Sequence, residues 1–76
     1  MLRSLHSLPY RKLRAALAKA RLDAAMTQEQ VAKKLKRPQS FVSKYESGER
    51  QLDVVEFVDV CNAIGAPPAA VIELLL

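Results

Sequence analysis

Residues 27–50 read TQEQVAKKLKRPQSFVSKYESGER, and two short helices account for the caps and apolar residues in this stretch. Thr27 offers a hydroxyl suited to an N-cap, and Gln30 follows three residues later, as in a capping box. Apolar residues then recur on one side of a helix, at Val31, Ala32 and Leu35. We therefore predict a helix over residues 28–35.

A second helix is predicted over about residues 38–47. Arg37 precedes a proline and is disfavoured in the helical conformation, whereas Pro38 can begin a helix without losing a needed hydrogen bond. Gly48 is suited to the left-handed conformation in which helices commonly end. Only a short turn is left between the two predicted helices.

Two helices joined by so short a turn cross steeply, which is the helix-turn-helix arrangement. Ala32 is small enough for a close crossing, and Val42 and Tyr45 form the matching apolar face of the second helix. An ordinary helical hairpin that binds no ligand would explain these apolar positions equally well.

The chain before this stretch predicts one more helix, from Tyr10 to about Leu22. Its apolar residues recur at helical spacing, at Leu13, Leu17, Ala20 and Ala24. Pro9 is suited to the first turn of this helix. Residues 1–8 carry little capping chemistry and are predicted to form a flexible N-terminal arm.

The chain after the stretch predicts two further helices. Asp53 is a good N-cap for a helix that Gly65 ends, and a short last helix follows over residues 68–75, with Val71 and Leu74 or Leu75 turned inward. The predicted fold is therefore all-α, a compact five-helix domain over residues 9–76.

The chain has 76 residues and is basic, with 12 Lys and Arg against 8 Asp and Glu and a net charge of +4. A chain of this length forms one domain with a small core, which makes a large active-site cleft unexpected. The basic charge favours a polyanion as the partner.

The chain has one cysteine, Cys61, and one histidine, His6, which excludes an internal disulfide and a zinc site. Cys61 lies on an apolar stripe and is expected to be a buried small hydrophobe. No apolar run is long enough for a signal peptide or a membrane span. We therefore expect a soluble cytoplasmic protein with no membrane partner.

The stretch of residues 27–50 resembles the helix-turn-helix of the Cro and lambda-repressor-like, XRE-type DNA-binding proteins. Residues 52–75, LDVVEFVDVCNAIGAPPAAVIELL, resemble the two helices that close the core in that family. The chain departs from the family pattern at Lys36, where glycine is usual, at Arg37, where an apolar residue is usual, and at Pro38, where serine or threonine is usual. The resemblance covers about residues 10–75, and it implies a lambda-repressor-like domain that binds double-stranded DNA and needs no cofactor.

The resemblance also implies a structural pair between Arg21, late in the first helix, and Glu46, near the end of the helix predicted over residues 38–47, which is the helix that reads DNA in this family. The alternative is two solvated charges, whose interaction would contribute only about 0–1 kcal/mol.

The resemblance places the DNA contacts on and beside the helix over residues 38–47. Gln28, at the start of the preceding helix, can reach a phosphate, and Arg37 and Arg50 could clamp the flanking phosphates. Base edges would be read by one polar face, formed by Gln39, Ser40, Ser43 and Lys44. Phe41 could pack on a thymine methyl or on the body of the protein. The alternative for the polar face is an ordinary solvated surface.

The leading hypothesis is a sequence-specific transcriptional regulator, a repressor that binds DNA as a homodimer. A candidate dimer interface is the apolar surplus near the C-terminal end, at Val55, Val58, Leu75 and Leu76. Two alternatives share the fold, an antitoxin with a toxin partner and a restriction–modification controller. A third is a protein-interaction adaptor that has lost DNA readout. An enzyme is not expected, because no nucleophile–base pair, carboxylate pair or phosphate loop is found.

Overall fold

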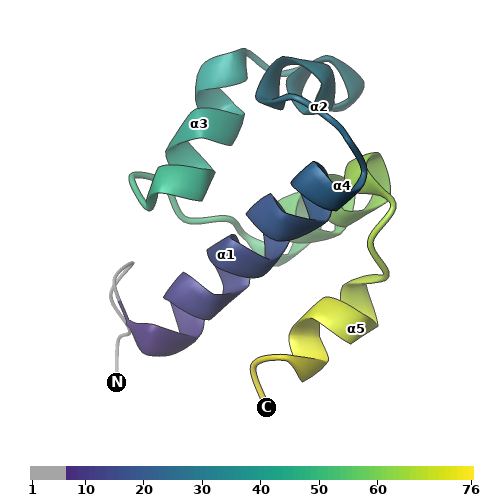
Figure 1. The fold of residues 1–76 in the computed structure, drawn as a ribbon. Helices are drawn as coiled ribbons and strands as arrows, with labels where there is room; N and C mark the ends of the chain where they lie inside the picture. The colour runs from purple at the N-terminus through teal and green to yellow at the C-terminus, as the bar shows by residue number, and fades with distance from the viewer. Residues whose placement is uncertain (1–6) are drawn as a thin grey trace.

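The computed structural model describes residues 7–76, and these residues form five α-helices and no strands (Figure 1). The all-α prediction is therefore confirmed. The helices are α1 (Leu8–Asp23), α2 (Gln28–Leu35), α3 (Gln39–Ser47), α4 (Val54–Ile64) and α5 (Pro68–Glu73). Residues 1–6, which include His6 and most of the predicted arm, lie outside the described residues.

Capping chemistry sets the starts of α2 and α4. The Thr27 hydroxyl accepts a hydrogen bond from the Gln30 amide at 3.1 Å, and the Gln30 side chain accepts one from the Thr27 amide at 2.8 Å. Asp53 and Glu56 make the same reciprocal bonds at 2.7 and 3.1 Å. Both N-caps, Thr27 and Asp53, agree with the prediction, as does the capping box of Thr27 and Gln30; the part of Glu56 in the second box was not predicted.

Helix α1 begins earlier than predicted. Ser7 is its N-cap and Leu8 its first residue, with Pro9 in the first turn. The described structure therefore assigns Ser7 and Leu8 to the start of this helix, although both fall in the segment predicted to be an arm. At the other end, Ala24 is an exposed C-cap residue and not part of the apolar stripe, because the helix ends at Asp23.

The turn between α2 and α3 also differs in detail from the prediction. Lys36 has φ 56° and ψ 42°, so a non-glycine residue adopts the left-handed conformation that ends α2. Pro38 is the N-cap of α3 with an extended backbone, so the helix begins at Gln39. Proline offers no side-chain cap, and the Pro38 carbonyl instead accepts the Phe41 amide at 3.0 Å. Lys36 therefore adopts a strained conformation that glycine would adopt freely.

The last helix ends at Glu73, two residues before its predicted end. Val71 is buried as predicted, at 6% exposure, whereas Leu74 is 63% exposed. Leu75 is partly buried, so of Leu74 and Leu75 it is Leu75 that turns inward.

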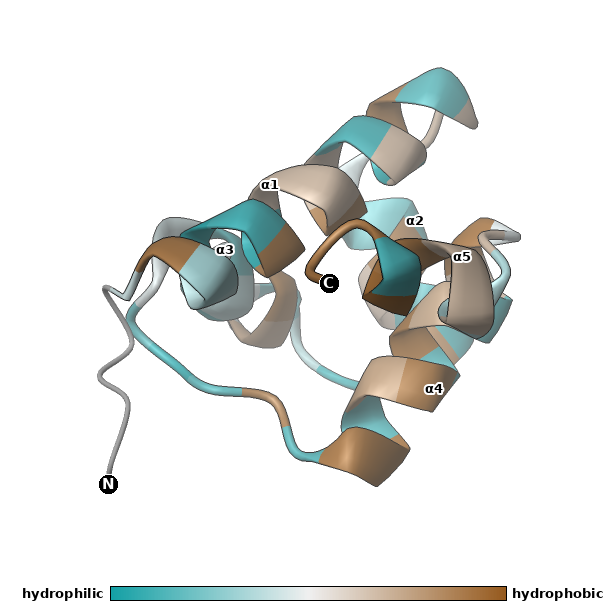
Figure 2. Cartoon of the chain, turned by 90° about the horizontal axis from the view of Figure 1, so that it is seen from below, coloured by the Kyte–Doolittle hydropathy of each residue, from teal (hydrophilic) through white to brown (hydrophobic). Residues whose placement is uncertain are grey.

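The core lies where α1 crosses beneath the α2–α3 pair and packs against α4 and α5 (Figures 1 and 2). Its fully buried side chains come from α1, α2, α3 and α4: Leu17, Val31, Val42, Tyr45, Val60 and Cys61. Burial raises the pKa of the Cys61 thiol, so the thiol stays protonated and packs as a small apolar group.

None of the helices in residues 7–76 has the length and apolar character needed to cross a lipid bilayer. Within the same part of the chain, no group of three His, Cys, Asp or Glu side chains could hold a metal ion.

Candidate nucleic-acid interface

Helix α3 has one buried face and one accessible face. Phe41, Val42 and Tyr45 are buried against the other helices. The four side chains predicted to read bases are all exposed: Gln39, Ser40, Ser43 and Lys44. Because these four residues lie on the side of α3 away from the core, a ligand can reach them together.

Gln28, at the first turn of α2, is linked to α3 by its amide group. Its Nε2 donates to Glu46 Oε1 at 3.1 Å, and its Oε1 accepts from Gln39 Nε2 at 3.5 Å. The side chains of Gln28 and Gln39 therefore lie next to each other at the edge of the accessible face.

Arg21 and Glu46 form an ion pair that joins α1 to the end of α3. Arg21 Nε and Nη2 donate to the two carboxylate oxygens of Glu46 at 2.7 and 3.0 Å, and Arg21 Nη1 donates to the Met26 carbonyl at 2.9 Å. Their side chains are only 12% and 9% exposed. The hydrogen bonds from Arg21 to Glu46 raise the pKa of the guanidinium. This geometry is unlike that of two solvated surface charges.

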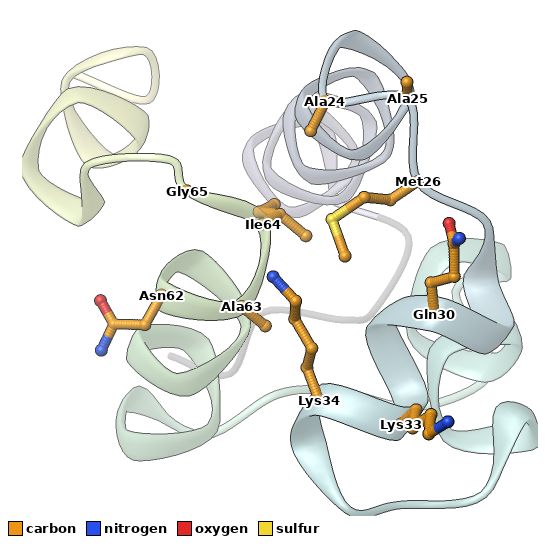
Figure 3. Close-up of a pocket in the computed structure, with 10 residues that line it drawn as sticks. All are labelled: Ala24, Ala25, Met26, Gln30, Lys33, Lys34, Asn62, Ala63, Ile64 and Gly65. Atoms are coloured by element: carbon orange, nitrogen blue, oxygen red, sulfur yellow. The ribbon is translucent and has the colours of Figure 1, made fainter.

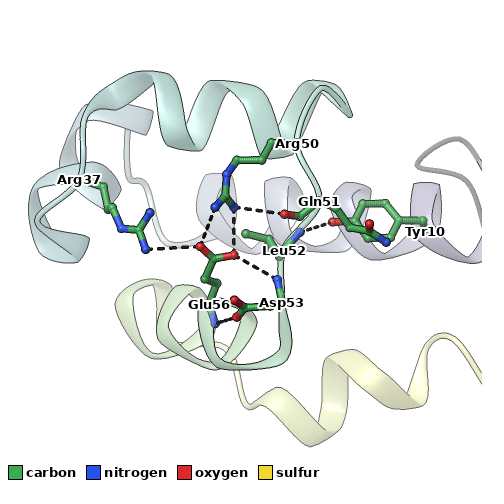
Figure 4. A network of polar contacts seen from close by, with 7 residues as sticks. All are labelled: Tyr10, Arg37, Arg50, Gln51, Leu52, Asp53 and Glu56. Carbon is green, nitrogen blue, oxygen red and sulfur yellow. Dashed lines mark hydrogen bonds and ion pairs between the residues drawn. The ribbon is translucent and has the colours of Figure 1, made fainter.

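Arg37 and Arg50 both form ion pairs with Glu56 of α4, a contact that the sequence did not predict (Figure 4). Arg50 donates to both carboxylate oxygens at 2.9 and 2.8 Å, and Arg37 donates to one of them at 3.3 Å. Both guanidinium groups also lie against the ring of Phe41, at 4.5 and 4.8 Å from its centroid. The two arginines therefore contact other residues of the protein, whereas the sequence predicted only that they would clamp flanking phosphates.

Phe41 itself is only 8% exposed. Of the two contacts considered for it, a thymine methyl or the body of the protein, the structure shows the second. Its ring also makes an edge-to-face contact with Tyr45, with 5.6 Å between the ring centroids.

Electrostatics explain the state of Glu56. The hydrogen bonds from Arg50, and next the backbone N–H of Asp53, lower the pKa of Glu56 to about 2. The same pairing raises the pKa of Arg50.

The available sequence signal was the position of Glu56, third in the helix that Asp53 caps and six residues after an arginine. A capping box explains that position locally, so the contact with Arg37, 19 residues away, was not evident.

An open groove of about 790 Å³ lies between the α1–α2 turn, α2 and α4 (Figure 3). Met26, Ala63 and Ile64 form its apolar part, and the side chain of Lys34 extends over it. None of the predicted DNA contacts lines this groove.

Comparison with known proteins agrees with this architecture. The helix-turn-helix domain family matches residues 12–74. No curated protein shows a significant sequence match to the chain. Among solved structures, an XRE-family like protein from Pseudomonas syringae pv. tomato is 48% identical, with a TM-score of 0.88; the match covers 92% of this chain and 85% of that one.

Two regulators are more distant neighbours. The clp gene regulator ClgR from C. glutamicum is 27% identical, with a TM-score of 0.81 and coverage of 92% of this chain and 91% of that one. A mutant of the restriction–modification controller protein C.Esp1396I, bound to its highest affinity operator site, is 26% identical with a TM-score of 0.80; the match covers 92% of each chain. The chain therefore belongs to the XRE family of helix-turn-helix proteins, whose fold is that of DNA-binding regulators.

Proposed function

We propose that this protein is a sequence-specific transcriptional regulator that binds double-stranded DNA as a homodimer and represses transcription. The observation that carries the proposal is the accessible face of α3, where Gln39, Ser40, Ser43 and Lys44 are exposed together beside Gln28. The similarity to a controller protein that is bound to its operator supports DNA as the ligand.

In the proposed complex α3 lies in the major groove. Glutamine matches the N6 and N7 atoms of adenine, lysine donates to O6 and N7 of guanine, and serine suits several bases. Gln28 and the free amide groups at the start of α2 would bind a backbone phosphate. Because Gln39 is hydrogen-bonded to Gln28, a phosphate contact by Gln28 would also orient the amide that reads a base.

Homodimer formation is supported by apolar residues on the surface of α4. Val54 and Val55 are 78% and 69% exposed, and Val58 is 37% exposed. Figure 2 shows hydrophobic residues at the first turn of α4, at the edge of the molecule. One α3 reads only a few base pairs, so two copies on half-sites about 34–36 Å apart would give useful specificity. Leu75 and Leu76, also named as candidates, lie beyond the end of α5.

Repression requires only that the protein occupy its DNA site, and a DNA-binding domain can supply that by itself. A second candidate, control of a restriction–modification system, is favoured by the likeness to the controller protein C.Esp1396I. A restriction enzyme encoded beside this gene would support that candidate, whereas a toxin gene and a stable complex with its product would support an antitoxin.

The test is selection of duplexes from a random-sequence library by the purified protein, followed by affinity measurements on the selected and a scrambled duplex. We expect a preferred site with two-fold symmetry. Gln39→Ala and Lys44→Ala should each weaken binding to the selected duplex more than to the scrambled one. Lys12→Ala, which removes an exposed cation of α1, is the matched control and should weaken both equally. No enrichment, or equal loss in all three variants, would contradict sequence-specific reading by α3.

The oligomeric state is tested by sedimentation of the wild-type protein and Val55→Glu. Because Val55 is 69% exposed, the variant should keep its helical content while it shifts from dimer to monomer. A wild-type protein that stays monomeric on its selected duplex would contradict the homodimer.

A further inference from the structure

Arg37 and Arg50 share one carboxylate, but they are held to very different degrees. The Arg50 guanidinium makes three hydrogen bonds, two to Glu56 and one to the Gln51 carbonyl at 3.1 Å. The Arg37 guanidinium makes one hydrogen bond, to Glu56 at 3.3 Å. Since a guanidinium has five N–H donors, most of the donors of Arg37 are available to a ligand.

The backbone around Arg50 is also anchored. The Leu52 amide donates to the Tyr10 hydroxyl at 2.8 Å, which ties the α3–α4 loop to α1 (Figure 4). Glu56 is fixed in turn by the capping box at the start of α4, where its carboxylate accepts the Asp53 amide. Glu56 and Arg50 are therefore held in place by several hydrogen bonds, whereas Arg37 is the least constrained member of the cluster, with 45% of its side chain accessible against 38% for Arg50.

The cluster carries one surplus positive charge, because two guanidinium groups share a single carboxylate. Arg37 immediately precedes Pro38, the N-cap of α3. In a helix-turn-helix the first helix of the pair crosses the DNA backbone and the start of the second enters the major groove, and Arg37 lies in the turn between these two helices. A DNA phosphate is thus the anion that the surplus charge would meet.

We propose that Arg37, Glu56 and Arg50 form a phosphate clamp, in which Arg50 fixes Glu56, Glu56 positions Arg37, and Arg37 donates to a DNA phosphate. The clamp rests on the proposed function, since it acts on the same DNA complex. In this clamp an acidic residue, Glu56, assists the binding of a polyanion, DNA. Glu56 restricts the conformations of a long, flexible side chain before DNA arrives, which lowers the entropic cost of the contact.

The first test is Glu56→Gln, compared with Glu49→Gln on the selected and scrambled duplexes. Each variant removes one negative charge, and Glu49 is exposed and makes no side-chain hydrogen bond in the described structure. Gln30 already serves in the capping box at Thr27, so glutamine should also preserve the cap at Asp53. Thermal unfolding of both variants checks that they are folded.

The clamp predicts that Glu49→Gln strengthens binding to both duplexes equally, through its charge. In Glu56→Gln the preference for the selected over the scrambled duplex should instead fall by about tenfold, because a mobile Arg37 no longer fixes the register of the protein on its site. Equal behaviour of the two variants would overturn the clamp while leaving the proposed function intact. A wild-type protein that prefers no duplex would overturn both.

The second test is the salt dependence of Arg37→Ala binding to the same duplexes. If Arg37 contacts a phosphate, the slope of log affinity against log salt should decrease by about 0.9 per bound protomer. An unchanged slope would overturn the assignment of Arg37, whatever the behaviour of Glu56→Gln. Because Arg37 is exposed, its replacement should not prevent folding.

Discussion

Two charged clusters lie beside α3, and they differ in burial and in their ratio of cations to anions. The Arg21–Glu46 pair is 12% and 9% exposed and has one cation for one carboxylate. The cluster of Arg37, Glu56 and Arg50 has two cations for one carboxylate, and its arginines are 45% and 38% exposed. The first cluster is saturated within the protein and stabilises the fold, whereas the second retains exposed donors and a surplus charge for a ligand.

The largest expected effect tests the first cluster. Arg21→Ala leaves Glu46 partly buried without its cation and removes the bond to the Met26 carbonyl, so the free energy of unfolding should fall by about 2 kcal/mol, between the values for exposed and buried pairs. Urea denaturation measures this. The control is Lys19→Ala, which removes an exposed pair with Asp23 and should cost under about 0.5 kcal/mol. Equal and small losses of unfolding free energy in the two variants would contradict the claim that the Arg21–Glu46 pair stabilises the fold.

The second cluster should affect DNA binding more than stability. Arg50→Ala removes two of the hydrogen bonds that hold the Glu56 carboxylate, so Glu56 positions Arg37 less well and affinity for the selected duplex should fall by about tenfold, the order expected for a misplaced backbone contact. Arg50→Lys should not restore binding, because lysine cannot donate to both carboxylate oxygens in the fixed geometry of a guanidinium. Affinity measurements on both variants test this, and full recovery with lysine would mean that charge alone matters.

Acid should weaken the second cluster in a defined pH range. The pKa of Glu56 is about 2 in the folded protein against 4.5 for an unperturbed glutamate. The folded state therefore binds fewer protons than the unfolded state between these pH values, and the ionised carboxylate contributes its full stabilisation above about pH 4.5. This stabilisation is lost as the pH falls from about 4.5 towards 2. The difference in melting temperature between the wild-type protein and Glu56→Gln should therefore shrink over that range. A difference independent of pH would show that Glu56 is not stabilised as a carboxylate.

The smallest effect is expected in the turn that leads to Arg37. Lys36 has a positive φ of 56°, which glycine adopts without strain. Lys36→Gly should therefore change the free energy of unfolding by no more than about 1 kcal/mol, in the stabilising direction. Chemical denaturation measures the change, and a clear destabilisation would show that the Lys36 side chain has a role of its own.

Sequence patterns predicted those parts of the fold that depend on neighbouring residues. Thr27 with Gln30 defined the start of α2, and Asp53 and Gly65 bounded α4, because caps act over a few positions. The start of α3 was displaced by one residue because Pro38 can stand either in the first turn or just before it. Its extended ψ of 153° decides between these alternatives, and a ψ angle is not determined by the residue type.

The candidate site was predictable as a set of exposed residues on α3, but not as a set of contacts. Arg37 and Arg50 were expected on either side of α3, and only the packing of α4 brings the Glu56 carboxylate between these two arginines. Likewise, the link from Gln28 to Glu46 requires the steep crossing of α2 and α3. Contacts between distant residues follow from tertiary structure and leave no local pattern.

The most direct test of DNA reading by α3 is the base preference at each position of the selected site, measured for the wild-type protein and for Gln39→Ala. Each lost base contact should cost about 1–3 kcal/mol of discrimination at the base pair it reads. We predict that Gln39→Ala loses its preference at one position in each half-site and keeps it at the others. An unchanged profile, or an equal loss of preference at every position, would contradict reading of bases by this face of α3.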